Sequence, residues 1–443
     1  MKKILLFLMI FTLALKLPSL FEPDWYTDEA IYLTVGQSLQ NGGKLYSDIA
    51  DNKPPFIYKI AQISGNIFNF KLILLFWSLV TVWIFYRLCL QQKSQYAPFI
   101  FAILLTSPFL EGNIANGEVF MLLPILLSLY ILNKTSHKQY LLAGFIAGFA
   151  LLIKFTSLFD IAALSFLVYL NTKSIKQTFS FLASASLPFL TTLFSFAISG
   201  NALSFIQNIF VKNTSYISSW YTGNQNSGPF TPPLVFRMLS LTVSCLVFTR
   251  LYLSKLLSKH SFFLLVWLCL SLFSATLSGR PYYHYYIQII SPLVLFLFSL
   301  NIFAKSKLFP LAICAFLLVS VHPYYKNFLS GNNPDFFPKD TQTLYNISHV
   351  VATQTSSEKK LLVWSNDPQI YYLSGRLPAY KYFTQFMIQD WGNMADLMDK
   401  VQLYMPIIVV DTNLLPPDQL SQLIQRYYLI LYAHKNYTVY VNR

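Results

Sequence analysis

The chain has 443 residues, of which 55% are apolar, 17% aromatic and only 11% charged. Soluble domains carry about 25% charged residues, so this composition excludes a soluble or disordered protein and is typical of a membrane protein. The net charge of +14 does not indicate nucleic acid as a partner, because the basic residues form short clusters between apolar stretches. All four cysteines lie inside apolar runs, which argues against disulfides and metal-binding spacings.

Eleven apolar runs are long enough to cross the roughly 30 Å core of a bilayer, allowing for tilt and short spans. They are residues 4–20, 71–90, 97–110, 119–133, 140–155, 158–171, 177–199, 233–253, 261–278, 286–303 and 307–322. The first run follows Lys2 and Lys3 as in a signal peptide, but no small-residue cleavage site comes after it, so we expect it to be retained. The sequence therefore predicts a mainly α-helical, polytopic membrane bundle with about eleven transmembrane helices.

Basic clusters in alternate connections predict the orientation of this bundle. They are Lys2 and Lys3, Arg87 and Lys93, Lys134 and Lys138, Lys173 and Lys176, Arg250 with Lys255 and Lys259, and Lys305 and Lys307. By the positive-inside rule the N-terminus is cytoplasmic in a plasma or inner membrane. A first loop (21–70), a second loop (200–232) and the C-terminal segment then lie outside. All 18 Asp and Glu residues fall on this outer side or at its membrane edge, so chemistry that needs carboxylates is expected there.

The C-terminal segment, residues 323–443, has more charge and no further apolar run. Short strand-like runs are predicted at 361–364, 406–410, 428–432 and 437–441, with helices near 366–374, 392–402 and 417–427. Strands that alternate with helices predict a small extracytoplasmic α/β domain. It has no phosphate-binding loop and no nucleophile motif, so we expect an accessory role. The predicted organisation is a transmembrane domain of residues 1–322 followed by this domain.

The first outer loop has the richest chemistry, beginning with the adjacent acids Asp28 and Glu29. They open a segment, 30–39, whose apolar residues recur at helical spacing, and acids at a helix N-terminus are ordinary. Two neighbouring carboxylates also repel each other, which raises one proton affinity toward the range of a general base. Asp28 and Glu29 are therefore candidate catalytic residues, with plain helix capping as the alternative.

Lys53 comes next, immediately before Pro54 and Pro55. The two prolines fix an extended backbone and hold the lysine where the chain returns to the membrane interface. An ammonium at that depth suits the phosphate of a lipid carrier, and the alternative is an ordinary interfacial lysine.

Three later turns on the outer side supply further candidates for substrate binding. Glu118 ends the polar turn 111–118 at the mouth of a span, where ionisable groups are costly and often functional. Lys154 and Asp160 bracket the next turn and either assist the chemistry or pair with each other.

The last turn contains Arg280, Tyr283 and His284 in an aromatic cluster. Arginine grips anions, histidine donates to phosphates or hydroxyls, and tyrosine rings offer faces for sugars. A plain aromatic belt at the membrane interface would use the same residues.

The order of these motifs resembles that of a known family. The motifs are Asp28-Glu29-Ala30-x-Tyr32, Gly43-x-x-Tyr46-x-Asp48, Lys53-Pro54-Pro55, Ala115-Asn116-x-Glu118 and His284-Tyr285-Tyr286. Over residues 1–305 they are similar to the bacterial branch of the GT-C fold membrane glycosyltransferases, which includes protein O-mannosyltransferase-like and aminoarabinose (lipid A) transferase-like enzymes.

This resemblance implies a glycosyltransferase that takes a sugar from a polyprenyl-phosphate donor. It would pass the sugar, with inversion, to a lipid, glycan or protein acceptor on the extracytoplasmic face of the bilayer. The resemblance makes Asp28 the base or acceptor-orienting residue, places Lys53 on the donor phosphate and makes Glu118 a second acid of the cleft. In the aminoarabinose transferases an acid before Lys-Pro-Pro takes part in a zinc site. Asn52 stands there in this chain, so we expect no metal and no other cofactor, and lipid A is less favoured as the acceptor.

Other functions fit parts of the pattern. A transporter or flippase for lipid-linked glycans would need polar groups near mid-membrane, whereas here they gather at one end of the spans. A polymerase or ligase of lipid-linked glycans also acts outside the cell, but the Asp-Glu loop with Lys-Pro-Pro favours the monosaccharide transferases. A mere anchor for the C-terminal domain would not need so many spans.

Overall fold

The computed structural model describes residues 2–90, 95–133, 136–216, 233–280, 282–300, 308–330 and 340–443. Four lysines of the predicted cytoplasmic loops (Lys93, Lys134, Lys305 and Lys307) and residues 217–232 of the second outer loop lie outside this part. The chain forms two compact units. The helical unit comprises Met1–Leu20, Lys71–Phe196 and Asn213–Phe328, and the sheet unit comprises Phe21–Phe70, Ala197–Lys212 and Leu329–Arg443.

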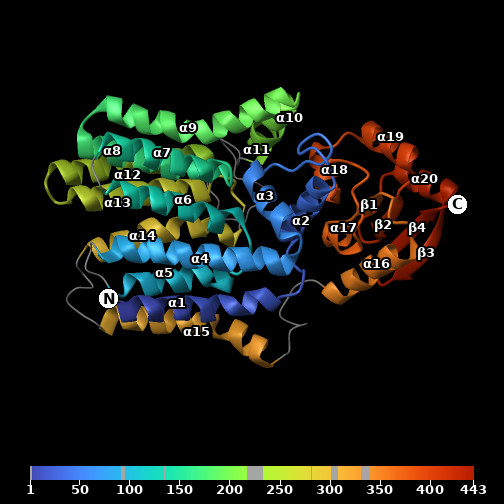
Figure 1. Cartoon of the computed structure of the whole chain (residues 1–443), viewed down its shortest axis with the longest axis horizontal. Helices are drawn as coiled ribbons and strands as arrows, with labels where there is room; N and C mark the ends of the chain where they lie inside the picture. The colour runs from blue at the N-terminus through green and yellow to red at the C-terminus, as the bar shows by residue number, and fades with distance from the viewer. Residues whose placement is uncertain are drawn as a thin grey trace. The chain divides into compact units, whose positions relative to one another are not determined.

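Each of the eleven apolar runs is helical in the structure. The helices are α1 (Lys2–Lys16), α4 (Ile67–Cys89), α5 (Ala97–Thr106), α6 (Gly117–Leu132), α7 (His137–Leu151), α8 (Leu158–Thr172), α9 (Ile175–Ile198), α12 (Leu234–Leu253), α13 (Lys259–Ala275), α14 (Ile287–Ser299) and α15 (Leu308–Ser330). Figure 1 shows them running side by side along a common direction. Within the described residues, five helical segments are long and apolar enough to cross a membrane by themselves: Lys2–Phe21, Ile67–Cys89, Phe155–Thr172, Ile175–Ile198 and Leu234–Leu253. The predicted helical bundle is confirmed, and the number of crossings stays a prediction.

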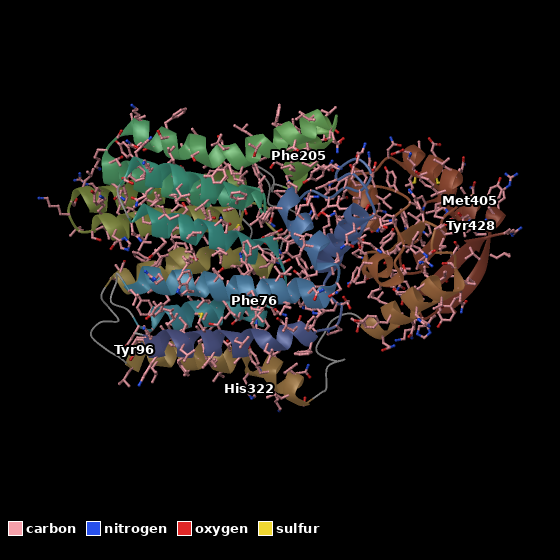
Figure 2. The ribbon with its side chains drawn as sticks, in the orientation of Figure 1. Phe76, Tyr96, Phe205, His322, Met405 and Tyr428 are labelled. Carbon is pink, nitrogen blue, oxygen red and sulfur yellow. The ribbon has the colours of Figure 1, made fainter. Side chains whose placement is uncertain are left out.

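Glycines allow close helix packing in the helical unit, whose interior also holds large aromatic side chains such as Trp267 and Phe101. A Cβ at Gly144 of α7 would lie 2.3 Å from the carbonyl oxygen of Phe181 in α9, so only glycine allows this approach. Large apolar side chains also face outward, such as Phe76 of α4, which is 60% exposed (Figure 2). An apolar outer surface on long apolar helices is what a multi-pass membrane protein requires.

The sheet unit contains the predicted strands. They are β1 (Leu361–Trp364), β2 (Ile407–Asp411), β3 (Tyr428–His434) and β4 (Tyr437–Asn442), in the order β1-β2-β4-β3. β1 pairs with β2 in parallel, and the other two pairings are antiparallel. The predicted helices appear as α17 (Gln369–Ser374), α19 (Met394–Tyr404) and α20 (Asp418–Tyr427), together with the unpredicted α16 (Thr341–Gln354) and α18 (Gln385–Trp391). The small C-terminal α/β sheet is therefore confirmed.

Segments from both outer loops belong to this same unit. They form α2 (Thr27–Gln40), α3 (Pro55–Ser64), α10 (Ala202–Ile206) and the π-helical turn Gln207–Val211, and the segment ends at Lys212, the first residue of α11 (Lys212–Tyr216). The structure thus groups residues 21–70 and 197–212 with the sheet, whereas the sequence-based division placed them in the transmembrane domain.

Hydrogen bonds explain this grouping. Thr34 of α2 donates to the carbonyl of Pro368 (3.1 Å), and the backbone amide of Ala50 donates to that of Lys381 (2.9 Å). The carboxylate of Asp24 accepts from Tyr345 (2.7 Å) and from Tyr372. These bonds fix the first outer loop, and with it Asp28 and Lys53, on the C-terminal segment.

Candidate functional site

The sheet unit brings Asp28 and Lys53 together. Asp28 lies in the first turn of α2, and Lys53 stands just before Pro54, the N-cap of α3. Lys53 Nζ lies 3.5 Å from Asp28 Oδ1 and equally 3.5 Å from Asp51 Oδ2. The predicted acid and the predicted lysine are therefore ion-paired, and we call Asp28, Lys53 and Asp51 the Asp–Lys cluster.

Asp51 is a member that the sequence analysis missed. It is buried and accepts a 2.7 Å hydrogen bond from the hydroxyl of Tyr58 in α3. Burial, and next the negative charge of Asp51, hold the pKa of Tyr58 well above its usual value, so this hydroxyl stays protonated and donates. The only signal in the sequence is that Asp51 stands two residues before Lys53.

Glu29, the other candidate catalytic acid, has different surroundings. It is buried in the first turn of α2, whereas Asp28 is partly exposed. Burial and then the charge of Asp24 raise the pKa of Tyr372, and the charge of Glu29 adds to this shift. The charge of Glu29 thus contributes to the environment of the tyrosine that joins the loop to α17, and Asp28 is ion-paired with Lys53.

A second cluster lies in the helical unit. Lys154 Nζ is 2.8 Å from Glu118 Oε1 and 5.2 Å from the centre of the Tyr285 ring. His284 Nε2 lies 3.9 Å from the same Glu118 oxygen, while His284 Nδ1 hydrogen-bonds to Glu111. We call Glu111, Glu118, Lys154 and His284 the Glu–His cluster; it unites three predicted substrate-binding residues.

Local structure explains how these side chains meet. Glu118 occupies the first turn of α6, where the helix dipole favours an acid. Lys154 follows the end of α7, and His284 lies in the 3₁₀ turn Tyr283–Tyr286 before α14. Glu111 has a positive φ of 56° in the tight turn after α5. At Gly112 in that turn, a Cβ would lie 2.2 Å from the carbonyl oxygen of Leu105.

Two predicted substrate-binding residues have other immediate surroundings. The half-exposed ring of Tyr283 lies 5.2 Å from that of Phe109. Arg280 is half-buried in the turn after α13, and its backbone amide donates to Ser278 Oγ (3.2 Å). Both remain in the helical unit, near His284 in the chain.

The pairing of Lys154 with Asp160, one of two expectations for that turn, is wrong. Lys154 pairs with Glu118, and Asp160 is buried with three donors from other helices. It accepts from Trp267 Nε1 (2.7 Å), Gln288 Nε2 (2.6 Å) and Ser271 Oγ (3.3 Å). The reason is that Asp160 lies in the first turn of α8, on the face that packs against α13 and α14. Its role is to join these three helices.

Lys212 is a further functional candidate that the sequence did not reveal. At the start of α11 in the sheet unit, it donates to Asn208 Oδ1 (2.8 Å) and to the hydroxyl of Tyr382, and its Nζ lies 5.4 Å from the Trp391 ring. Burial, and next the charge of Lys381, lower the pKa of Lys212 to about 7 against the opposing effect of the Asp51 charge.

This shift predicts a pH-dependent stability. Because the pKa of Lys212 is lower in the folded chain than in the unfolded one, unfolding takes up a proton between about pH 7 and pH 10. The contribution of Lys212 to stability therefore rises with pH over this range, and the full cost of burying its charged ammonium is present below pH 7.

We expect Lys212→Met to raise the thermal unfolding midpoint at pH 6 by about 2 °C, and this gain to shrink toward pH 9. The same change at the exposed Lys59 should have no such pH dependence. An equal effect of Lys212→Met at both pH values would contradict the assignment.

Metal ligands were not expected from the sequence. Within the described ranges, no three His, Cys, Asp or Glu side chains are grouped so that they could hold a metal ion. The expectation of a metal-free site stays a prediction.

Comparison with known proteins identifies the fold. No protein-family model matches the chain, and no curated protein matches it in sequence. ArnT from Cupriavidus metallidurans, solved in the apo state, is similar in structure with a TM-score of 0.60, over 98% of this chain and 97% of that chain, at 13% identity. The oligosaccharyltransferase of Archaeoglobus fulgidus, solved with zinc and sulfate, gives a TM-score of 0.51 over 99% of this chain and 73% of that chain, also at 13% identity. The chain has the GT-C fold. The GT-C fold implied by the motif order is thus confirmed. Because the sequence identity is low, these matches support the fold alone.

Proposed function

We propose that this GT-C protein is a membrane glycosyltransferase that moves a sugar from a polyprenyl-phosphate donor to an acceptor on the extracytoplasmic face. The observation that carries the proposal is the 3.5 Å contact between Asp28 and Lys53, a partly exposed carboxylate beside an ammonium on a proline-fixed turn. The names of both structural neighbours support the chemistry, since one is an oligosaccharyltransferase and the other is ArnT, whose family the motif order resembles.

The proposed reaction is a single displacement at the anomeric carbon. Asp28 takes the proton of the acceptor hydroxyl or orients it, and the hydroxyl oxygen forms the new bond to the sugar. The bond between the sugar and the phosphate breaks, and its electron pair leaves with the phosphate oxygen. Lys53 stabilises the charge that develops there, more in the transition state than in the ground state. One base opposite the leaving group gives inversion.

For the Glu–His cluster we propose substrate binding by Glu118, Lys154 and His284, assisted by Arg280 and Tyr283. A lysine and a histidine that share carboxylates can exchange these partners for anionic or hydroxyl groups. The proposed topology has the N-terminus in the cytoplasm and the C-terminal segment outside, because the acids would then face the lipid-linked sugar. The acceptor belongs to the lipid, glycan or protein class.

The test is a transfer assay with membranes that contain the protein and a panel of radiolabelled polyprenyl-phosphate sugars. We expect transfer of at least one sugar, and a loss of about 100-fold or more in Lys53→Met, because the leaving phosphate loses its cation. Lys59→Met, which removes an exposed lysine six residues later, is the matched control and should keep full activity. Movement of the labelled lipid across the bilayer without transfer would reject the proposal in favour of a flippase. Transfer of assembled glycans but no single sugar would indicate a ligase.

A further inference from the structure

The Asp–Lys cluster contains a carboxylate that the proposed reaction does not use. Lys53 Nζ lies at the same 3.5 Å distance from Asp28 and Asp51, so two acids share one ammonium. Their burial differs, since the Asp51 side chain is 1% exposed and that of Asp28 is 26% exposed. The two carboxylates are thus unequal partners of the lysine.

Hydrogen bonds fix Asp51 and the backbone of Lys53 together. The hydroxyl of Tyr58 donates to Asp51 Oδ2 (2.7 Å) and accepts from the backbone amide of Lys53 (3.2 Å). The hydroxyl of Tyr46 donates to the carbonyl of Lys53 (2.8 Å). Since both tyrosines are fully buried, Asp51 cannot leave the lysine without disrupting the turn.

Asp28 is the more accessible of the two acids. The hydroxyl of Tyr32, one helical turn later, lies 3.5 Å from Asp28 Oδ2, at the limit of a hydrogen bond. Tyr32 also lies below the lysine, with its ring centre 5.1 Å from Lys53 Nζ. A carboxylate that is partly exposed can turn from the ammonium toward an acceptor that enters from solvent, which the buried Asp51 cannot do.

We propose that Asp51 is a positioning residue of the transfer reaction, which holds the Lys53 ammonium in place and so allows Asp28 to leave it and take the acceptor's proton. This inference rests on the proposed function. Asp51 compensates the charge of Lys53, so the lysine does not permanently lower the proton affinity of Asp28.

The surrounding charges define what a pH experiment measures. Asp51 faces Tyr58 of α3, Tyr46 of the loop and, at longer range, Lys212 of α11, whose charge it stabilises. Asp28 faces Lys53 and Tyr32. Loss of the negative charge at position 51 removes one of the two acids that lie 3.5 Å from Lys53 Nζ, and a less compensated ammonium lowers the proton affinity of Asp28.

The experiment compares the pH–rate profile of Asp51→Asn with that of the wild type, in the full-length protein. We expect kcat to fall about 10-fold and the acidic limb of the profile to move to lower pH by roughly half a unit or more, because Asp28 becomes a weaker base. A role in folding alone would reduce the amount of active enzyme and leave the limb in place. That result, or a kcat within about twofold of the wild type, would overturn the inference.

Three variants make this outcome specific. Asp51→Glu keeps the charge and should return the limb toward its wild-type position, and Tyr58→Phe should lower kcat without moving it. Asp48→Asn removes an exposed acid of the same loop and should change neither quantity. A wild type that transfers no sugar would reject the proposed function itself. An active wild type with inactive Asp28→Asn and unaltered Asp51→Asn would reject only the role of Asp51.

Discussion

Replacing Asp28 with Asn should lower sugar transfer by at least about 100-fold, because general-base catalysis typically contributes that much or more. The amide cannot take the hydroxyl proton, yet it keeps the size and the hydrogen-bonding oxygen of the carboxylate. Binding of the donor should change little, since Lys53 keeps Asp51 as a partner at 3.5 Å. The loss should therefore appear in kcat rather than in KM for the donor, measured with the sugar that the wild type transfers best.

Glu29→Gln is the matched control for this result. It removes a carboxylate from the adjacent position of α2, where Glu29 is buried and its charge helps to raise the pKa of Tyr372. We expect kcat to stay within about threefold of the wild type, with any larger effect on thermal stability. A large loss of kcat in Glu29→Gln together with an active Asp28→Asn would assign the base to Glu29.

Much of the fold was predictable because its signals are local. Apolar runs such as 71–90 and 233–253 became α4 and α12 with ends within a few residues of those expected. The strands were predictable for the same reason, since residues 361–364 and 407–410 are continuous apolar runs, and both are buried in the sheet unit. The grouping of the first loop with the sheet was not predictable, because it depends on single long-range bonds such as Asp24 to Tyr345.

The candidate site shows the same division. Asp28 and Lys53 stood out because an acid pair and a double proline are visible in a short stretch of sequence. Asp51 did not, because its importance comes from its burial and its hydrogen bond with Tyr58, and no local sequence pattern predicts that contact. The choice between partners for Lys154 was open for the same reason: Glu118 is 36 positions away in the chain, and only the packing of α6 beside α7 brings the two together.

We expect Glu118 and Lys154 to depend on each other for the stability of the helical unit. The side chains are 3% and 15% exposed, so removing one charge leaves the other poorly solvated. We expect Glu118→Gln to reduce the free energy of unfolding by about 3 kcal/mol, the usual cost of an uncompensated buried charge. The measurement is unfolding of the purified protein by titration with a denaturing detergent.

The double variant Glu118→Gln/Lys154→Met separates this effect from ordinary packing. Methionine fills the volume of the lysine stem without its charge, so the double variant should be more stable than Glu118→Gln alone, and the two changes should be non-additive by more than about 1 kcal/mol. His284, 3.9 Å from the same Glu118 oxygen, limits the recovery because it loses that acid too. Lys138→Met, on the exposed start of α7, is the control and should leave the effect of Glu118→Gln unchanged. Simple additivity of Glu118→Gln and Lys154→Met would mean that the two groups do not depend on each other, and the role of the pair in holding the Glu–His cluster would have to be abandoned.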